Sequence, residues 1–246
     1  MTRELDLIST ALQGASSASV APQGATRIVM ILDRSGSMSG TEADVIGGFN
    51  SFVASCREAE LKDCSLSYIR FDAEIEHVFT LPLADVPPMT ALLYQPRGST
   101  ALLDAVGQSV NAMANNAGDR YLVITHTDGY ENASREWTRE KVAALLRERQ
   151  ALGNWTFAFF GADIDAWEEA GGMGYQTANA AAYSKQRTRD AMRATGRVAG
   201  VMSKSDLMRS DRYAAAAKAV MDDPGLSDAE IERQLKEESD SGGADG

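Results

Sequence analysis

The sequence predicts an α/β protein with a doubly wound, mostly parallel open sheet, one antiparallel edge strand and additional C-terminal helices. Three apolar runs are nearly continuous, which is typical of strands buried on both faces of a sheet. Amphipathic helical patterns separate these runs, so the strands they connect must be parallel. A gap of only two residues elsewhere indicates a hairpin and therefore one antiparallel strand. The three runs are RIVMILD at 27–33, YLVIT at 121–125 and WTFAFFGA at 155–162.

The first half of the chain supplies one buried strand, two helices and the hairpin. After 27–33, the segment 41–60 carries apolar residues at helical spacing. The segments 65–71 and 74–81 are separated only by Asp72 and Ala73, so we expect them to pair as a hairpin at or near an edge of the sheet. The segment 98–117 then has the apolar face of an amphipathic helix.

The second half continues the alternation. A charged amphipathic helix is expected at 137–153, between the buried strands at 121–125 and 155–162, and Gly153 would end it. A short helix at 164–172 and a short, weak strand or extended connection at 177–184 complete the sheet domain.

The pattern divides the chain into four parts. Residues 1–25 are expected to be a lead-in and linker, and 26–183 the α/β domain. Residues 184–238 contain three helical stretches that either dock on the sheet domain or engage another chain, and 239–246 should be a disordered tail.

Composition narrows the class of protein. The 246 residues include 24 Lys and Arg against 35 Asp and Glu, a net charge of -11 that argues against a nucleic-acid-binding protein. No stretch is long and apolar enough to span a membrane, and the first 24 residues lack the apolar core of a signal peptide. The two cysteines, Cys56 and Cys64, do not make a secreted disulfide framework. We therefore expect a cytoplasmic protein with two buried thiols.

Polar residues follow the strands at the edge where ligands bind in open α/β sheets. Asp33, Ser35 and Ser37 alternate after the first strand, Thr100 precedes the second long helix, and Asp128 follows YLVIT. All five are hard oxygen donors of the kind that suit Mg²⁺ or Mn²⁺. Neutral hydroxyls would leave the ion with much of its charge, so a carboxylate from a partner could complete its shell.

Several alternatives compete for the stretch after the first strand. On its own it could be a polar turn that leads into a helix. An EF-hand fits poorly because Gly40 is misplaced and a strand precedes the loop. A serine nucleophile fits poorly because Ser37 lacks the G-x-S-x-G elbow and the chain has only His77 and His126 to act as a base.

These residues also carry a family resemblance. Asp33-Arg-Ser35-Gly-Ser37, Thr100 within GSTALLDA and Asp128 within THTDG resemble the metal-ion-dependent adhesion site of von Willebrand factor A domains. DxSxS alone is a weak signal, whereas the three motifs in this order are specific. His126 is a small departure, since an apolar residue would be expected there.

The resemblance implies a non-enzymatic module that binds a protein partner through Mg²⁺, with Mn²⁺ or Ca²⁺ as alternatives. Ser35, Ser37 and Thr100 would bind the ion directly, while Asp33 and Asp128 would act mainly through water. The partner would supply an Asp or Glu side chain. A bacterial or phage intracellular assembly is the implied setting, and an AAA+ ATPase is one candidate partner. The alternatives are a metal-dependent hydrolase or phosphatase, and an assembly protein that uses its C-terminal helices.

Overall fold

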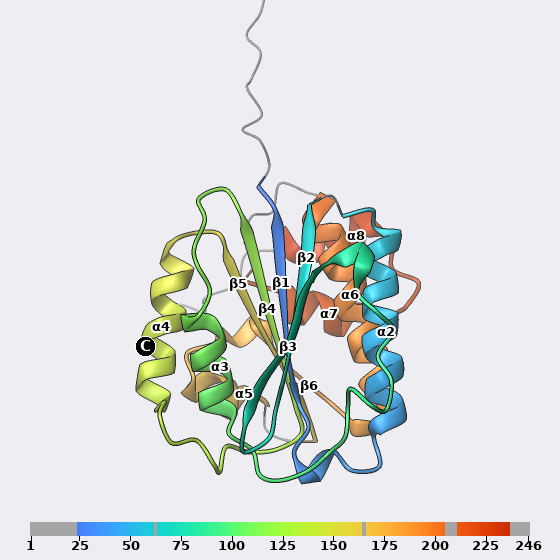
Figure 1. Ribbon diagram of the computed structural model, residues 1–246. Coiled ribbons are helices and arrows are strands. Elements are labelled where there is room, and N and C mark those ends of the chain that lie inside the picture. Colours follow the sequence, from blue (N-terminus) through green and yellow to red (C-terminus); the bar gives the residue numbers. More distant parts are fainter. Residues whose placement is uncertain (1–23, 62, 164–165, 205–210, 237–246) are drawn as a thin grey trace, which may run out of the picture.

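The computed structural model describes residues 24–61, 63–163, 166–204 and 211–236 (Figure 1). The predicted tail and nearly all of the predicted lead-in lie outside these residues. The strands are β1 (Thr26–Asp33), β2 (Cys64–Phe71), β3 (Ile75–Pro82), β4 (Arg120–Thr127), β5 (Trp155–Ala162) and β6 (Ala180–Tyr183). The helices are α2 (Glu42–Glu58), α3 (Leu102–Asn111), α4 (Arg139–Ala151), α5 (Ala166–Gly172), α6 (Thr188–Lys204), α7 (Tyr213–Asp222) and α8 (Asp228–Lys236).

The strands form one sheet in the order β3-β2-β1-β4-β5-β6. All neighbours run parallel except β2 and β3, which form the predicted antiparallel hairpin at the edge. The predicted fold class is therefore confirmed. Since β1 and β4 lie side by side and run parallel, their carboxyl ends meet at the lower edge of the sheet in Figure 1.

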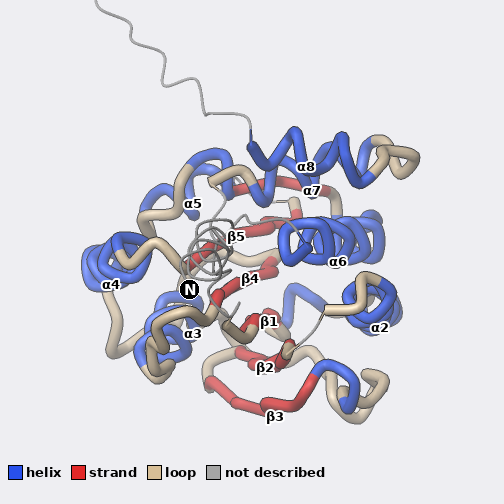
Figure 2. Tube along the Cα trace, turned by 90° about the horizontal axis from the view of Figure 1, so that it is seen from above, coloured by secondary structure: helices blue, strands red, loops and turns tan. Residues whose placement is uncertain are grey.

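Helices cover both faces of the sheet, as Figure 2 shows. The side chains of β1 alternate between two buried clusters because successive residues of a strand point to opposite faces. Met30 and its neighbours on that face pack with α2, α6, α7 and α8. Ile31 packs with α3 and α4 on the other face. This double burial accounts for the continuous apolar sequence of the central strands.

The three helices that follow β6 pack on the sheet through the first of these clusters. Met192 of α6, Tyr213 of α7 and Ile231 of α8 are fully buried in it. Helix α6 lies close against α2, and Gly196 permits this approach: a Cβ at this position would lie 2.8 Å from the Phe52 carbonyl oxygen. Ser227 and Glu230 form the expected capping box at the start of α8.

Helix α3 is shorter than the predicted helix at 98–117. Gly98 has a φ of +69°, and the following three residues belong to a loop rather than to the helix. Beyond the helix, the Tyr121 hydroxyl donates to the carbonyl oxygen of Ala114 and accepts from the amide of Asn116. These bonds hold residues 114–116 in a turn that joins α3 to β4.

Two further expectations concern the cysteines and membranes. Cys56 and Cys64 are both free and buried, as predicted. Burial raises the pKa of the Cys64 thiol to about 12. None of the helices in the described part of the chain has the length and apolar character needed to cross a bilayer.

Candidate metal site at the carboxyl edge of the sheet

The five predicted ligands lie on three loops that meet where β1 and β4 end. Asp33 is the last residue of β1, and Asp128 follows the last residue of β4. Thr100 lies just before α3. Asp33, Ser35, Thr100 and Asp128 are buried, whereas Ser37 is exposed. The cluster therefore opens to solvent beside Ser37.

The first loop is organised around the Asp33 carboxylate. The Ser35 amide donates to Asp33 Oδ1 at 2.6 Å, which folds the chain back over the carboxylate. The Thr127 hydroxyl donates to Asp33 Oδ2 at 2.5 Å and so joins β1 to the end of β4. The hydroxyl oxygens of Ser35 and Ser37 are 3.0 Å apart. The alternation seen in the sequence thus brings both hydroxyls to one side of the loop.

Asp128 completes this group from the second loop. The Ser37 hydroxyl donates to Asp128 Oδ1 at 2.6 Å. The other carboxylate oxygen, Oδ2, is buried and accepts no hydrogen bond, although the Lys185 ammonium lies 2.6 Å from it. This contact is an ion pair. Because this buried oxygen already pairs with a positive charge, it is suited to interact with a metal cation.

Thr100 is positioned by its backbone. Its amide donates to the side chain of Asn132 at 2.9 Å, and its carbonyl oxygen accepts from the amides of Asn132 and Ala133. A Cβ on Gly129 would lie 2.9 Å from Thr100 Oγ1 and 3.4 Å from Ser37 Oγ. The two hydroxyls therefore face the same small space, which any larger residue at 129 would fill.

The loop that follows Asp128 also caps helix α3. Glu131 accepts from the amide of Leu103 at 2.9 Å, and Ser134 Oγ accepts from the amide of Asp104 at 2.9 Å. Asp104 in turn accepts from the amides of three residues at 135–137. These acidic side chains have structural partners, which fixes the spacing between the Thr100 and Asp128 loops.

The donor set fits a hard divalent cation. The described residues hold no group of three or more His, Cys, Asp or Glu side chains arranged for a metal, so the site depends on its hydroxyls. Three hydroxyls and two carboxylates are oxygen donors, which Mg²⁺ and Mn²⁺ prefer over softer ligands. The structure brings Asp33, Ser35, Ser37, Thr100 and Asp128 together; their individual roles toward an ion stay predictions.

Burial dominates the electrostatics of Asp33. Desolvation raises the pKa of its carboxyl from 3.8 to about 6, although hydrogen bonds from Thr127 and Ser35 lower it. The nearby Asp128 raises it further. Two buried acids thus influence each other, and a cation near both would stabilise their ionised forms.

Mn²⁺ binding is expected to weaken as the pH falls below 6. At pH 7 most of the Asp33 carboxyl is ionised, because its pKa is about 6. Below that pH a proton competes with the metal, so the apparent affinity should fall by about tenfold per pH unit. Calorimetry at pH 5, 6 and 7 measures this slope, and an affinity that does not change over this range would contradict the prediction.

The free energy of unfolding of the metal-free protein should decrease as the pH rises, whereas the metal affinity should increase. The folded-state pKa of Asp33 lies above its usual 3.8, so the folded protein holds this proton more tightly than the unfolded chain. The resulting stability is fully present below pH 3.8 and is lost as the pH rises through 6, a difference of roughly 3 kcal/mol. The increase in Tm caused by Mn²⁺ should therefore be larger at pH 7 than at pH 5.

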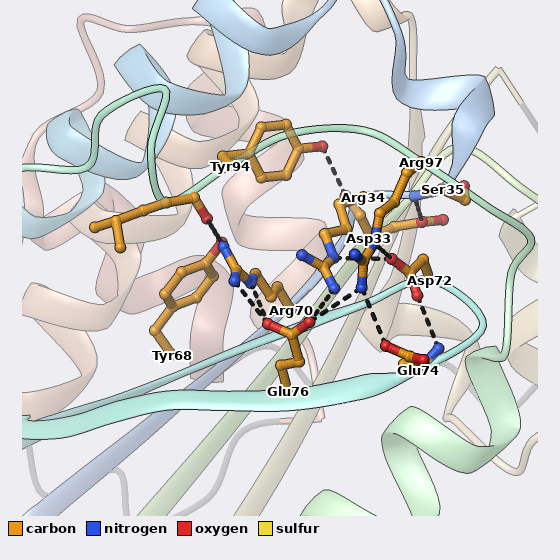
Figure 3. A network of polar contacts seen from close by, with 11 residues as sticks. Asp33, Arg34, Ser35, Tyr68, Arg70, Asp72, Glu74, Glu76, Tyr94 and Arg97 are labelled. Atoms are coloured by element: carbon orange, nitrogen blue, oxygen red, sulfur yellow. Dashed lines mark hydrogen bonds and ion pairs between the residues drawn. The ribbon is translucent and has the colours of Figure 1, made fainter.

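A network of charged residues holds the first loop against the hairpin (Figure 3). Arg34, whose side chain is 4% exposed, points toward the hairpin and pairs with Asp72 at 3.1 Å and with Glu76. Arg70 also binds Glu76, and these arginines lower the pKa of that carboxyl, Arg70 most strongly. Arg97 pairs with Asp72 at 2.6 Å. The network joins β1, the hairpin and the loop before α3.

Backbone bonds reinforce this connection. The Arg97 amide donates to the Arg34 carbonyl oxygen at 2.7 Å, and the Gly36 amide donates to the Gly98 carbonyl oxygen at 3.0 Å. The Ala101 amide donates to the Asp72 carbonyl oxygen at 2.8 Å. The Ser35 and Thr100 loops are therefore fixed to each other and to the hairpin, and their hydroxyls are held in place before any ligand binds.

Neither histidine offers a base to this cluster. The His126 ring packs 4.8 Å from Phe160, and its Nδ1 lies 3.3 Å from the Tyr183 hydroxyl. Burial lowers the pKa of His126 to about 3, so the ring is neutral at pH 7. His77 lies on the edge strand β3, where it pairs with the Thr80 hydroxyl.

Two features of the site were not predicted from sequence. Lys185 lies at the start of the C-terminal helical stretches, and its ammonium reaches Asp128. Asp72, from the predicted hairpin gap, accepts from the turn amide of Glu74, and it also pairs with Arg34. One sequence signal points to the Arg34–Asp72 pair. Arg34 lies between the predicted ligands Asp33 and Ser35, in a loop at the end of a buried strand, where a charged side chain needs a partner.

Comparison with known proteins supports the fold. No protein family model matches the sequence, and no curated protein does. Solved structures do match: the von Willebrand factor type A protein from Catenulispora acidiphila has a TM-score of 0.54 at 16% identity, over 72% of this chain and 43% of its own. Proximal thread matrix protein 1 from the mussel byssus gives 0.53 at 16%, over 72% and 46%, also in a structure whose metal-ion-dependent adhesion site holds zinc.

A third solved structure is matched over nearly its whole chain. The von Willebrand factor domain of the type V pili tip protein Mfa5 from Porphyromonas gingivalis has a TM-score of 0.52 at 14% identity, over 74% of this chain and 97% of its own. This chain spans less than half of the length of the Catenulispora and mussel proteins. The sheet order, the helical layers and these matches together show that the chain has the fold of von Willebrand factor A domains.

Proposed function

We propose that this protein is a non-enzymatic binding module that recruits a protein partner through a divalent cation. The observation that carries the proposal is the convergence of three hydroxyls and two carboxylates at the carboxyl edge of the sheet, open to solvent at Ser37. Mg²⁺ is the first choice of ion, with Mn²⁺ and Ca²⁺ as alternatives. The intracellular, cytoplasmic setting is part of this proposal.

The residues have distinct roles in this proposal. Ser35, Ser37 and Thr100 would hold the ion with neutral oxygens, while Asp33 and Asp128 would orient those hydroxyls and balance charge. The bound ion would supply positive charge to an Asp or Glu side chain of the partner. The solved structures with this fold include a pilus tip protein and a byssus matrix protein, which supports a role in a protein assembly. An AAA+ ATPase is one candidate partner.

Metal binding and partner binding can be tested on the same protein. Calorimetry with MgCl₂, MnCl₂ and CaCl₂ should show one site. Immobilised protein should then capture a partner in Mg²⁺ and release it in EDTA, and Ser37→Ala should capture none. Neutralising the partner's acidic side chain should abolish binding. Absence of metal binding would refute the proposal, as would metal-dependent phosphatase or esterase turnover that Ser37→Ala removes.

A further inference from the structure

Lys185 places a positive charge against two residues of the predicted metal site. It lies in the short helix η4 (Lys185–Arg187), between β6 and α6. Its ammonium is 2.6 Å from Asp128 Oδ2, and the Asp128 side chain is fully buried. Since Ser37 already donates to Oδ1, both oxygens of the carboxylate are engaged. The ammonium therefore occupies the same carboxylate that a divalent ion would use.

The ammonium has a second contact within the predicted ligand set. It donates to the Ser37 carbonyl oxygen at 3.3 Å, so it lies against two of the five predicted residues. A divalent ion held by Ser37 and near Asp128 would meet this charge at close range, where like charges repel strongly in a poorly solvated site. The ion and the ammonium therefore compete for the negative charge of Asp128.

The backbone at Lys185 is fixed, whereas its side chain can leave. The Arg187 amide donates to the Ser184 carbonyl oxygen at 2.8 Å, and the Thr188 hydroxyl donates to the Lys185 carbonyl oxygen at 2.7 Å. Arg187 also binds Asp222 of α7. The Lys185 side chain is 29% exposed and has a flexible four-carbon stem, so the ammonium can move into solvent without moving the helix.

We infer that Lys185 is a tethered competitor that neutralises Asp128 in the metal-free protein and must be displaced when a divalent ion binds. It sets the metal concentration at which the site fills. This inference rests on the proposed function. A lysine with only a structural role would instead support the site, and its removal would weaken metal binding.

Lys185→Met should bind Mn²⁺ more tightly than the wild type, because the methionine keeps the length of the side chain and removes the competing charge. Coupling between two ligands at neighbouring sites is typically about 5- to 150-fold, so the Kd measured by calorimetry should fall by at least about fivefold. In EDTA the same variant should have a lower Tm, because the buried Asp128 carboxylate loses its ion-pair partner.

Two further variants serve as controls. Lys185→Arg keeps the charge and should bind Mn²⁺ within about twofold of the wild type. Lys218→Met removes the same charge from an exposed pair with Asp222 on α7 and should leave the Kd unchanged. Circular dichroism establishes that each variant is folded.

The outcomes separate this inference from the proposed function. Tighter binding by Lys185→Met, or binding by this variant alone, supports the competitor role. Equal or weaker binding by Lys185→Met, when the wild type binds Mn²⁺, overturns the inference and leaves the proposed function intact. If neither protein binds Mn²⁺, the proposed function fails, and the inference fails with it.

Discussion

Asp33→Asn is expected to weaken Mn²⁺ binding by about 10- to 100-fold. Asparagine has the same shape and can still accept the Ser35 amide through its oxygen, so the loop should keep its course. The Thr127 hydroxyl would lose Asp33 but can donate to the Gly129 carbonyl oxygen, which lies 3.1 Å away. The variant thus removes one negative charge from the site with little other change, and calorimetry measures the effect.

A matched control lies at the same edge of the sheet. Asp163 follows β5, is exposed, and has a φ of +54°, a conformation that asparagine tolerates. Asp163→Asn should bind Mn²⁺ like the wild type. In EDTA at pH 7, Asp33→Asn should be at least as stable as the wild type because it removes a desolvated charge. An affinity within threefold of the wild type would show that Asp33 does not serve a metal site.

Arg34→Met should lower the free energy of unfolding by about 3–5 kcal/mol. Arg34 is buried between Asp72 and Glu76, and the Asp72 side chain is 3% exposed. Without the guanidinium, the half-exposed Arg97 is the one ion-pair partner that Asp72 keeps among the residues the structure describes. A buried carboxylate that loses its main counter-charge is costly, and urea denaturation measures the loss.

The same variant should also weaken Mn²⁺ binding, because the network holds the Ser35 and Thr100 loops together. Arg193→Met is the control: Arg193 pairs with Asp190 in an exposed pair on α6, and its loss should cost less than about 1 kcal/mol. If Arg34→Met were as stable as Arg193→Met, the network would contribute little to the fold. Normal Mn²⁺ affinity in a destabilised variant would show that the loops are held by their backbone bonds alone.

The sheet could be predicted from sequence because its signals are local. The runs at 27–33 and 155–162 are apolar on both faces, and both became central strands. The two-residue gap at Asp72 and Ala73 located the edge hairpin. The length of α3 could not be predicted in the same way, because the residues before it are held by bonds to Asn132, which is 32 positions from Thr100.

The site residues could be predicted because they follow strand ends, and parallel strands place those ends together. The ends of β1 and β4 are joined by two hydrogen bonds: Thr127 donates to Asp33, and Ser37 donates to Asp128. Lys185 and Arg34 could not be identified from spacing. Each is a charged side chain whose partner is distant in sequence, and a charged residue in isolation is most often solvated.

The capping of α3 affects how an acidic partner could bind. A helix N-terminus normally offers free amides and a positive dipole to an anion. Here Glu131 and Ser134 already bond the amides of Leu103 and Asp104, so these two amides of α3 are not available to an anion. Removal of the metal by chelation should therefore release an acidic partner, because these two amides cannot hold its carboxylate in place.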